Sequence, residues 1–253
     1  MGCLNDLQPQ KKNEKRSVRK FTISSNVIRK SLKVDDVACI VPTLNEYSTV
    51  ADVVSKAMRF TRHVVVVDGN SEDDTIEVAS RAGAEVILQD GKGKGMALRT
   101  AFNKVNSDIY VILDGDATYD VMEMEKILQP ILEGEADMVI GSRLKGKMED
   151  GSISRLNRLG NRFFNFLINS FFHGEITDSQ SGFRAISREA VGNMDLSSNG
   201  FEIETEMTIK ALKQGLKIRE VPITYMRRRG TPSKLNSFKA GSRILKTIIA
   251  HLW

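Results

Sequence analysis

Cysteine and histidine are scarce in this sequence, which has two cysteines, Cys3 and Cys39, and three histidines. Since there is no CxxC pair and no Cys/His cluster, a disulfide framework and a structural zinc site are both disfavoured, and a reducing compartment fits. Apolar runs of 18 or more residues and a secretory signal pattern are also missing. We therefore expect a cytoplasmic protein without a bilayer-spanning segment.

Acidic residues are missing from the C-terminal stretch 226–253, and charge is unevenly distributed along the chain. The formal net charge is +5, made up of +5 in residues 1–36, −7 in 37–225 and +7 in 226–253. An acidic body between basic ends argues against a nucleic-acid binder with one broad basic face. It suits contact with anionic lipid or phosphate at particular places. We interpret residues 1–36 as a basic, flexible tail, for which a merely solvated segment is an equal alternative.

Short apolar runs alternate with helix-forming stretches in the first part of the chain. We expect strands at 37–41, 63–67, 85–88, 109–113 and 137–140. We expect helices at about 49–59, 73–82, 95–104 and 121–132. This alternation predicts an α/β fold, Rossmann-like, with a mostly parallel sheet and helices on both faces.

Polar clusters follow four of these predicted strands, at 42–46, 68–71, 114–116 and 141–143. Ligands of such sheets bind beyond the carboxyl ends of the strands, so we expect the four clusters on one rim. Later in the chain we expect a helix at 202–214 and an edge strand near 218–226.

The stretch LDGDATYD, residues 113–120, places Asp114 and Asp116 on the turn after a buried strand, with Gly115 between them. Two carboxylates this close repel each other unless a cation lies between them. Mg²⁺ and Mn²⁺ prefer oxygen ligands and complete their coordination with water and substrate phosphates. We predict a metal–diphosphate site here, with a solvated turn as the alternative.

Two other stretches have both a functional and a plainer interpretation. In Pro42-Thr43-Leu44-Asn45-Glu46, the amide and carboxylate could bond a ribose or base, although a helix-start turn is the simpler explanation of this stretch alone. Gly91-Lys92-Gly93-Lys94-Gly95 lacks the spacing of a P-loop. Its amides and Lys94 could still meet an anion, and a flexible basic turn is equally compatible with the pattern.

Taken in order, these stretches resemble family 2 glycosyltransferases of the GT-A fold, whose PxxNE, DxSxDxT and DxD motifs bind a sugar nucleotide and its metal. Three later stretches, GSR (141–143), DSQSGFR (178–184) and GTPSKL (230–235), look like the polyprenyl (dolichyl) phosphate glycosyltransferase branch. The resemblance covers about residues 37–245. It implies an inverting transfer of sugar from a nucleotide-sugar to polyprenyl phosphate, with Mg²⁺ or Mn²⁺ as cofactor, feeding protein or surface glycosylation.

The resemblance also implies roles for individual residues and a division of the chain. It places the nucleotide-sugar half at 37–143 and the acceptor half at 144–235. The nucleoside pocket is expected from Pro42, Leu44, Asn45, Glu46, Val67 and Asp68. The ribose, diphosphate and metal are expected to meet Asp114, Gly115 and Asp116, with Thr118 where some members have a metal-binding Gln. Phosphates are expected to be held by Lys94, Arg143, Arg155, Arg228 or Arg229, and Lys234. The catalytic assignments are Asp116, Arg143, Asp178 and Gln180.

Two departures from the family pattern leave points open. Members with a paired Asp after the second strand use the second one against the base, and here that position is Gly69. Uracil and guanine therefore both remain possible, and we favour UDP-glucose or UDP-N-acetylglucosamine over GDP-mannose. One extra residue between Gly230 and Ser233 leaves Arg228 and Arg229 as equal candidates for the family arginine.

The acceptor determines whether a general base is needed. A lipid monophosphate has a second pKa near ~6, so its oxygen is already largely ionised. An alcohol acceptor, such as phosphoglycerate or a polysaccharide, needs a carboxylate base. The candidates for that base are Asp178, Glu202, Glu204 and Glu206. A nucleotide-sugar-binding module without catalysis is a third possibility.

Phenylalanines and arginines crowd residues 155–172, and a similar apolar and basic pattern fills the amphipathic C-terminal segment 236–253. Such a helix either packs as core or lies in the headgroup zone of a membrane. We expect peripheral contact with the cytoplasmic face of a membrane, and the sequence leaves the oligomeric state open.

Overall fold

The computed structural model describes residues 36–230 and 237–252, so nearly all of the predicted basic tail lies outside the described residues. The strands are β1 Val37–Thr43, β2 His63–Asp68, β3 Glu85–Leu88, β4 Ile109–Ile112, β5 Met138–Met148, β6 Arg184–Ser187 and β7 Ile218–Tyr225. The helices are α1 Val50–Ala57, α2 Thr75–Arg81, α3 Lys94–Lys104, α4 Met124–Leu132, α5 Arg155–Phe172, α6 Arg188–Gly192, α7 Ile203–Lys213 and α8 Ser237–Ala250. A 3₁₀ turn, η2 Val121–Glu123, leads into α4.

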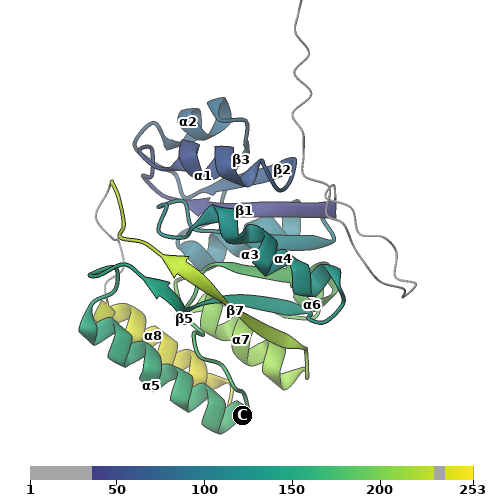
Figure 1. Ribbon diagram of the computed structural model, residues 1–253, viewed down its shortest axis with the longest axis vertical. Helices are drawn as coiled ribbons and strands as arrows, with labels where there is room; N and C mark the ends of the chain where they lie inside the picture. Colours follow the sequence, from purple (N-terminus) through teal and green to yellow (C-terminus); the bar gives the residue numbers. More distant parts are fainter. Residues whose placement is uncertain (1–35, 231–236, 253) are drawn as a thin grey trace, which may run out of the picture.

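The strands form one seven-stranded sheet in the order β3-β2-β1-β4-β6-β5-β7 (Figure 1). Strands β3, β2, β1 and β4 are parallel neighbours, and β5 is parallel to β7. Among the strands that the structure describes, only β6 runs antiparallel, to β4 on one side and to β5 on the other. The predicted mostly parallel α/β sheet is therefore confirmed, with β7 at an edge as expected.

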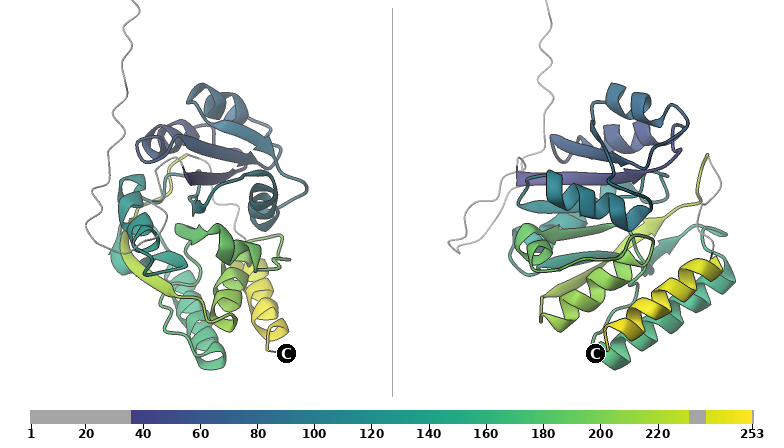
Figure 2. Two further views of the ribbon diagram at one scale, coloured as in Figure 1. Left: turned by 90° about the vertical axis from the view of Figure 1, so that its right-hand side faces the viewer. Right: turned by 180° about the vertical axis from the view of Figure 1, so that it is seen from behind.

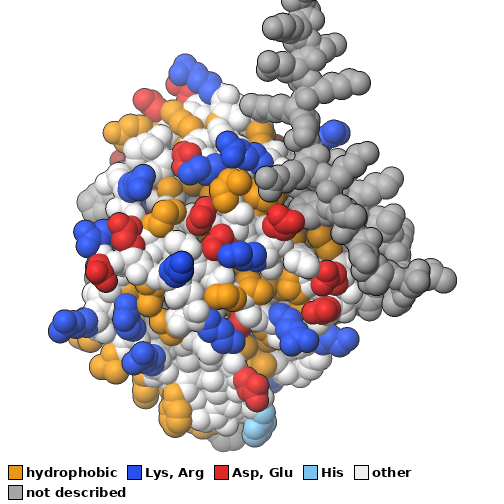
Figure 3. Space-filling model, viewed as in Figure 1, with side chains coloured by type: hydrophobic (Ala, Val, Ile, Leu, Met, Phe, Trp, Pro, Cys, Tyr) orange, Lys and Arg blue, Asp and Glu red, His pale blue; other side chains and the backbone are white. Residues whose placement is uncertain are grey.

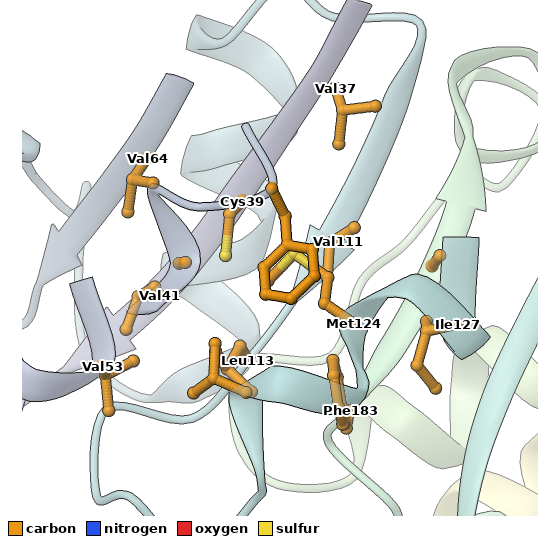
Figure 4. Close-up of a cluster of buried hydrophobic side chains, with 14 of the residues drawn as sticks. Val37, Cys39, Val41, Val53, Val64, Val111, Leu113, Met124, Ile127 and Phe183 are labelled. Atoms are coloured by element: carbon orange, nitrogen blue, oxygen red, sulfur yellow. The ribbon is translucent and has the colours of Figure 1, made fainter. Parts of the chain in front are cut away.

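Hydrophobic side chains fill both faces of the sheet, because successive residues of a strand point to opposite sides. In β1, Cys39 and Val41 join a cluster with α1 and α4, whereas Ala38 and Ile40 join a cluster with α3 and α7. Figure 4 shows the first cluster, which includes Phe183 together with side chains of β1, β2, β4 and α4. Two covered faces leave the carboxyl ends of the strands as the place where polar side chains can gather.

Two strands differ from the sequence-based expectation. The fifth strand continues to Met148, so residues 141–143 lie inside β5 and not after its end, and its register against β7 shifts between Ser142 and Lys147. Strand β6 was not predicted, because four residues that begin with an arginine carry no clear alternation. Arg184 is fully buried there, and its guanidinium donates to the backbone oxygens of Ser179, Ser181 and Glu204.

Helices α5 and α8 lie side by side on the β5–β7 side of the molecule (Figures 1 and 2). Together with α7 they enclose a small interior of Ile168, Ile209, Ile244 and Ile248, with a few partly buried neighbours. Much of their remaining apolar surface is exposed. Within residues 36–230 and 237–252, no helix has the length and apolar character needed to cross a bilayer.

Candidate active site

A cavity of about 890 Å³ opens at the carboxyl ends of the central strands. The ends of β1, β2, β3 and β4 form one part of it, and α5 and α8 form the opposite part. Each of the four predicted clusters contributes a lining residue, including Leu44, Gly69, Asp116 and Arg143. The structure thus brings together stretches that lie far apart in the sequence.

Asp114 shares a buried lysine with a glutamate from α7. The Nζ atom of Lys94, at the start of α3, lies 2.5 Å from Asp114 Oδ1 and 2.6 Å from Glu204 Oε1. Burial alone would lower the pKa of Lys94, but the two carboxylates outweigh it and raise the pKa above its ordinary value. Lys94 is therefore a fixed positive charge, and Glu204 is already paired.

The backbone at Gly182 passes close to the Lys94–Asp114 ion pair. A Cβ atom added to Gly182 would lie 2.7 Å from Lys94 Nζ and 2.8 Å from Asp114 Oδ2. Only glycine leaves room for the ion pair at this position, which follows directly on Ser181 in the DSQSGFR stretch.

Asp116 is held by two neighbours. Its Oδ1 accepts from the Thr118 backbone N–H at 3.1 Å and from the Thr118 hydroxyl at 2.6 Å, while Arg228 pairs with both Asp116 and Glu46. Burial and the nearby charge of Asp114 raise the pKa of Asp116, although Thr118 and Arg228 act in the other direction. Thr118 was predicted as a metal ligand. Its hydroxyl donates a hydrogen bond to Asp116 and so positions that carboxylate.

The structure distinguishes between Arg228 and Arg229, the two candidates for the family arginine. Arg228 lines the cavity and reaches both carboxylates, whereas Arg229 is exposed and does not line it. Arg155 is likewise exposed at the first position of α5 and is not part of the lining. Lys234 lies outside the described residues.

Asp114 and Asp116 fit a hard divalent cation. Positive side chains lie against both carboxylates, which shows that this corner of the fold requires positive charge. In the part of the chain that the structure describes, no group of three or more His, Cys, Asp or Glu side chains could hold an ion alone. An ion here would depend on two carboxylates, with diphosphate oxygens and water completing its coordination.

Three residues predicted for the nucleoside pocket do not line the cavity. Val67 is fully buried in the core. Asp68 is buried and accepts from the Thr43 hydroxyl at 2.9 Å and from the backbone and hydroxyl of Ser71 at 2.7 and 2.6 Å. Asn45 has a left-handed backbone, with φ of 52°, and its Oδ1 accepts from the Glu72 N–H at 2.8 Å. Asp68 and Asn45 therefore shape the loops around the pocket.

The other nucleoside candidates, Pro42, Leu44 and Glu46, do line the cavity, together with two residues that were not among the predicted site residues. These are Gly69, after β2, and Gln89, after β3. Gly69 occupies the position where some members of the resembled family have a base-contacting Asp, whereas Gln89 stands in no motif, since a lone glutamine has no characteristic spacing.

Arg143 is fixed by Asp178. Its Nε and Nη2 atoms lie 2.8 and 2.7 Å from the two oxygens of Asp178, and its backbone N–H donates to the same carboxylate at 2.9 Å. The guanidinium also lies over the Tyr225 ring, 5.1 Å from its centroid. Burial would lower the pKa of Arg143, but Asp178 outweighs it, so this arginine stays charged. Asp178 is fully buried and acts through Arg143.

Gln180 lines the cavity with its amide already engaged. Its Nε2 donates to the Ser179 hydroxyl at 3.0 Å and to the Thr205 hydroxyl at 2.7 Å. The remaining base candidates lie away from the lining. Glu202 accepts from the Gly200 N–H at 3.0 Å, and Glu206 is fully buried.

Replacing Glu206 by glutamine is expected to lower stability in a pH-dependent way. Burial would raise the pKa of Glu206, but hydrogen bonds from Lys210, Ser198 and Ser197 lower it from 4.5 to about 2. A depressed folded-state pKa gives stability that is present above the ordinary value and is lost as pH falls from about 4.5 toward about 2. Urea unfolding should show Glu206→Gln less stable by about 1–3 kcal/mol at neutral pH, with the difference shrinking in acid.

The exposed Glu175 offers a control for this measurement, because Glu175→Gln makes the same chemical change on the surface. A Glu206→Gln deficit that is equally large at pH 7 and in strong acid would contradict this account.

Comparison with known proteins places these features in a family. The model described as "Glycosyl transferase family 2" matches residues 38–194. Glycosyltransferase AglJ of Haloferax volcanii is 42% identical over 83% of this chain and 70% of its own length. The dolichyl-phosphate hexose transferase of the same organism is 34% identical over 85% of this chain and 93% of its own.

Solved structures agree on the fold. Glucosyl-3-phosphoglycerate synthase of Mycobacterium tuberculosis, in complex with Mn²⁺, UDP-glucose and phosphoglyceric acid, superposes with a TM-score of 0.72. The match covers 86% of this chain and 80% of that one at 23% identity. At this identity the likeness supports the architecture and leaves substrates to be argued from the site.

Proposed function

The chain belongs to glycosyl transferase family 2, and we propose that it transfers a sugar, with inversion, from a nucleotide-sugar to dolichyl phosphate or a similar polyprenyl phosphate. The observation that carries the proposal is the two-sided cavity. Carboxylates and cations occupy its strand-end part. Its opposite wall is apolar and includes Leu156, Leu159, Phe163, Phe164, Phe238, Ile244 and Leu245. An acceptor that combines a phosphate with a hydrocarbon chain matches both parts.

The charges favour a phosphate over an alcohol as nucleophile. The carboxylates among the described lining residues are Glu46, Asp114, Asp116 and Glu204, and each is paired with Lys94 or Arg228. A paired carboxylate is a weak proton acceptor, so activation of an alcohol is poorly supported. A lipid monophosphate arrives already ionised and needs neutralisation more than deprotonation.

In the proposed reaction, side chains of the protein hold positive charge in fixed positions around the substrate phosphates. Arg143, held by Asp178 and Tyr225, and Arg228 provide fixed guanidinium groups for phosphate oxygens. Thr118 keeps Asp116 in place. Mg²⁺ or Mn²⁺, held by Asp114 and Asp116, would stabilise the negative charge on the leaving diphosphate.

Helices α5 and α8 also provide a surface for a membrane. Exposed apolar side chains on them include Leu156, Phe163, Phe166, Phe171, Phe238 and Ile249. Arginines and lysines alternate with these residues along both helices, and Figure 3 shows the two classes intermixed on the part of the surface where α5 lies. We assign this face to peripheral contact with an anionic, cytoplasmic membrane surface. Flotation with vesicles that contain or lack anionic lipid tests the assignment.

Replacing Phe163 by serine is expected to weaken binding of a long-chain acceptor specifically. Phe163 is half exposed and lines the apolar part of the cavity, so the change removes hydrocarbon contact. In detergent, KM for a long polyprenyl phosphate should rise about tenfold, while KM for an analogue with one or two isoprene units stays unchanged.

Phe166→Ser is the matched control, because Phe166 is exposed on the same helix and does not line the cavity. Equal effects of the two substitutions, or an equal effect of Phe163→Ser on long and short acceptors, would count against this location of the lipid chain.

The proposed activity as a whole is tested by incubating the protein with labelled nucleotide-sugars, Mn²⁺ and either polyprenyl phosphate or phosphoglycerate. We expect label to enter the organic phase with polyprenyl phosphate. Label in a water-soluble product formed only with phosphoglycerate would favour the alcohol acceptor instead, and donor left intact with both would favour a binding module.

A further inference from the structure

The strand-end part of the cavity contains an amide side chain, Gln89, that the mechanism above does not use. Gln89 follows β3, lines the cavity and is only 9% exposed. Its backbone N–H donates to the Asp68 oxygen at 3.0 Å, and the neighbouring Gly69 N–H donates to the Thr43 oxygen at 2.9 Å. The ends of β1, β2 and β3 thus hold Gln89 on a rigid base.

The orientation of the amide follows from its partner. Gln89 Nε2 lies 2.7 Å from the backbone oxygen of Gly91, which can only accept a hydrogen bond. The nitrogen therefore faces Gly91, and the amide cannot be turned over without losing this bond. In the described part of the chain no other hydrogen bond is made by this amide, so Oε1 and the second N–H of Nε2 remain for a ligand.

Gly69 leaves space beside this amide. A Cβ atom at Gly69 would lie 3.5 Å from both the Nε2 and Oε1 atoms of Gln89 and 3.2 Å from the Thr43 oxygen. A larger side chain would cover the amide, whereas glycine leaves one side of it open, and both residues line the cavity. Pro42 and Leu44 supply apolar surface at the same end.

We propose that Gln89 recognises the base of the donor nucleotide and that this base is uracil. This inference rests on the proposed function, which places the diphosphate at Asp114 and Asp116 and the lipid chain against α5 and α8. The strand ends of β1, β2 and β3 are then the part of the cavity left for the nucleoside. Uracil N3–H donates to Oε1, and the second Nε2–H donates to uracil O4.

The alternatives fit the same amide less well. Cytosine presents an acceptor at N3 and an amino donor beside it, so both hydrogen bonds are reversed. Guanine presents N1–H and O6 in a suitable pattern, but its additional amino group needs a second acceptor. The side chains of Pro42 and Leu44, which line the cavity, provide none, and the Thr43 oxygen already accepts from the Gly69 N–H. A buried unpaired donor strongly disfavours a ligand.

The test is calorimetric and does not require turnover. With Mn²⁺ present, the protein should bind UDP at least about tenfold more tightly than CDP, GDP or N3-methyl-UDP, which lacks the N3–H donor. Gln89→Ala should weaken UDP binding about tenfold and abolish the preference for UDP over N3-methyl-UDP. Gln89→Glu should shift preference toward GDP, because a carboxylate accepts from both guanine donors and repels uracil O4.

Two controls separate this inference from the proposed function. Gln129→Ala, an exposed glutamine on α4 that bonds Glu133, should bind every nucleotide as the unchanged protein does. Inorganic pyrophosphate with Mn²⁺ reports on the Asp114/Asp116 corner alone. Unchanged UDP binding by Gln89→Ala, or CDP or GDP binding as tight as UDP, overturns the role of Gln89 and leaves the proposed function standing. Failure of pyrophosphate to bind contradicts the proposed function itself.

Discussion

Replacement of Asp116 by asparagine should reduce sugar transfer about a thousandfold or more while the protein stays folded. The amide keeps the size of the side chain and can accept from Thr118, but it cannot neutralise a divalent cation. Initial rates with polyprenyl phosphate and Mn²⁺ titration by calorimetry should both show the loss.

The same substitution, Asp116→Asn, should leave the thermal stability of the protein unchanged or raise it, although it reduces activity. Burial and Asp114 raise the pKa of Asp116 in the fold, so its ionised form costs stability once pH rises through that pKa. Asparagine removes this cost at neutral pH, and we expect a melting temperature no lower than that of the unchanged protein. Asp90→Asn is the control, because Asp90 is exposed and pairs with Lys104 on the surface. Activity within a few-fold of normal in Asp116→Asn would contradict the site.

The second large effect is expected for Arg228→Gln. Arg228 bridges Glu46 and Asp116, so it competes with a metal ion for Asp116 and is also placed to meet a phosphate. Its removal should lower kcat/KM for the lipid acceptor about a hundredfold or more. The same change should increase the affinity for Mn²⁺ measured without nucleotide, because two carboxylates lose their positive partner.

Arg229→Gln is a control with the same loss of charge one residue away, at an exposed side chain outside the cavity lining. It should change acceptor kinetics and Mn²⁺ affinity only slightly, as expected for a screened surface charge. If both variants behaved alike, the effect would come from net charge and not from the bridge.

The sequence predicts well those parts of the fold that depend on local pattern. Strands β1, β2 and β4 are continuous apolar runs buried on both faces, and Asp114 and Asp116 follow one of them at a spacing with its own chemical meaning. Strand β6 has no such pattern, and only its two neighbours make Arg184–Ser187 a strand.

Site residues that depend on distant partners were harder to predict. Lys94 attracts attention in a glycine- and lysine-rich turn, but its pairing with Glu204 exists only after α3 and α7 pack on the same face of the sheet. Gln89 and Gly69 come together in the cavity lining only because the ends of β2 and β3 lie side by side. Conversely, Asp68 and Asn45 stand in motifs and yet serve the loops, because local hydrogen bonds use their oxygens.

The position of β6 has a consequence for how a bulky substrate enters and leaves. Strand β6 forms backbone hydrogen bonds with both β4 and β5. Strand β4 leads to Asp114 and β5 contains Arg143, so both are fixed to the same neighbouring strand. Separating these two strands would break a ladder of backbone hydrogen bonds to β6. Helices α5 and α8 form the other part of the cavity, and they pack on each other and on α7 through a small apolar cluster. We therefore expect a bulky substrate to enter and leave by movement of α5 and α8, while β6 keeps Asp114 and Arg143 at a constant separation.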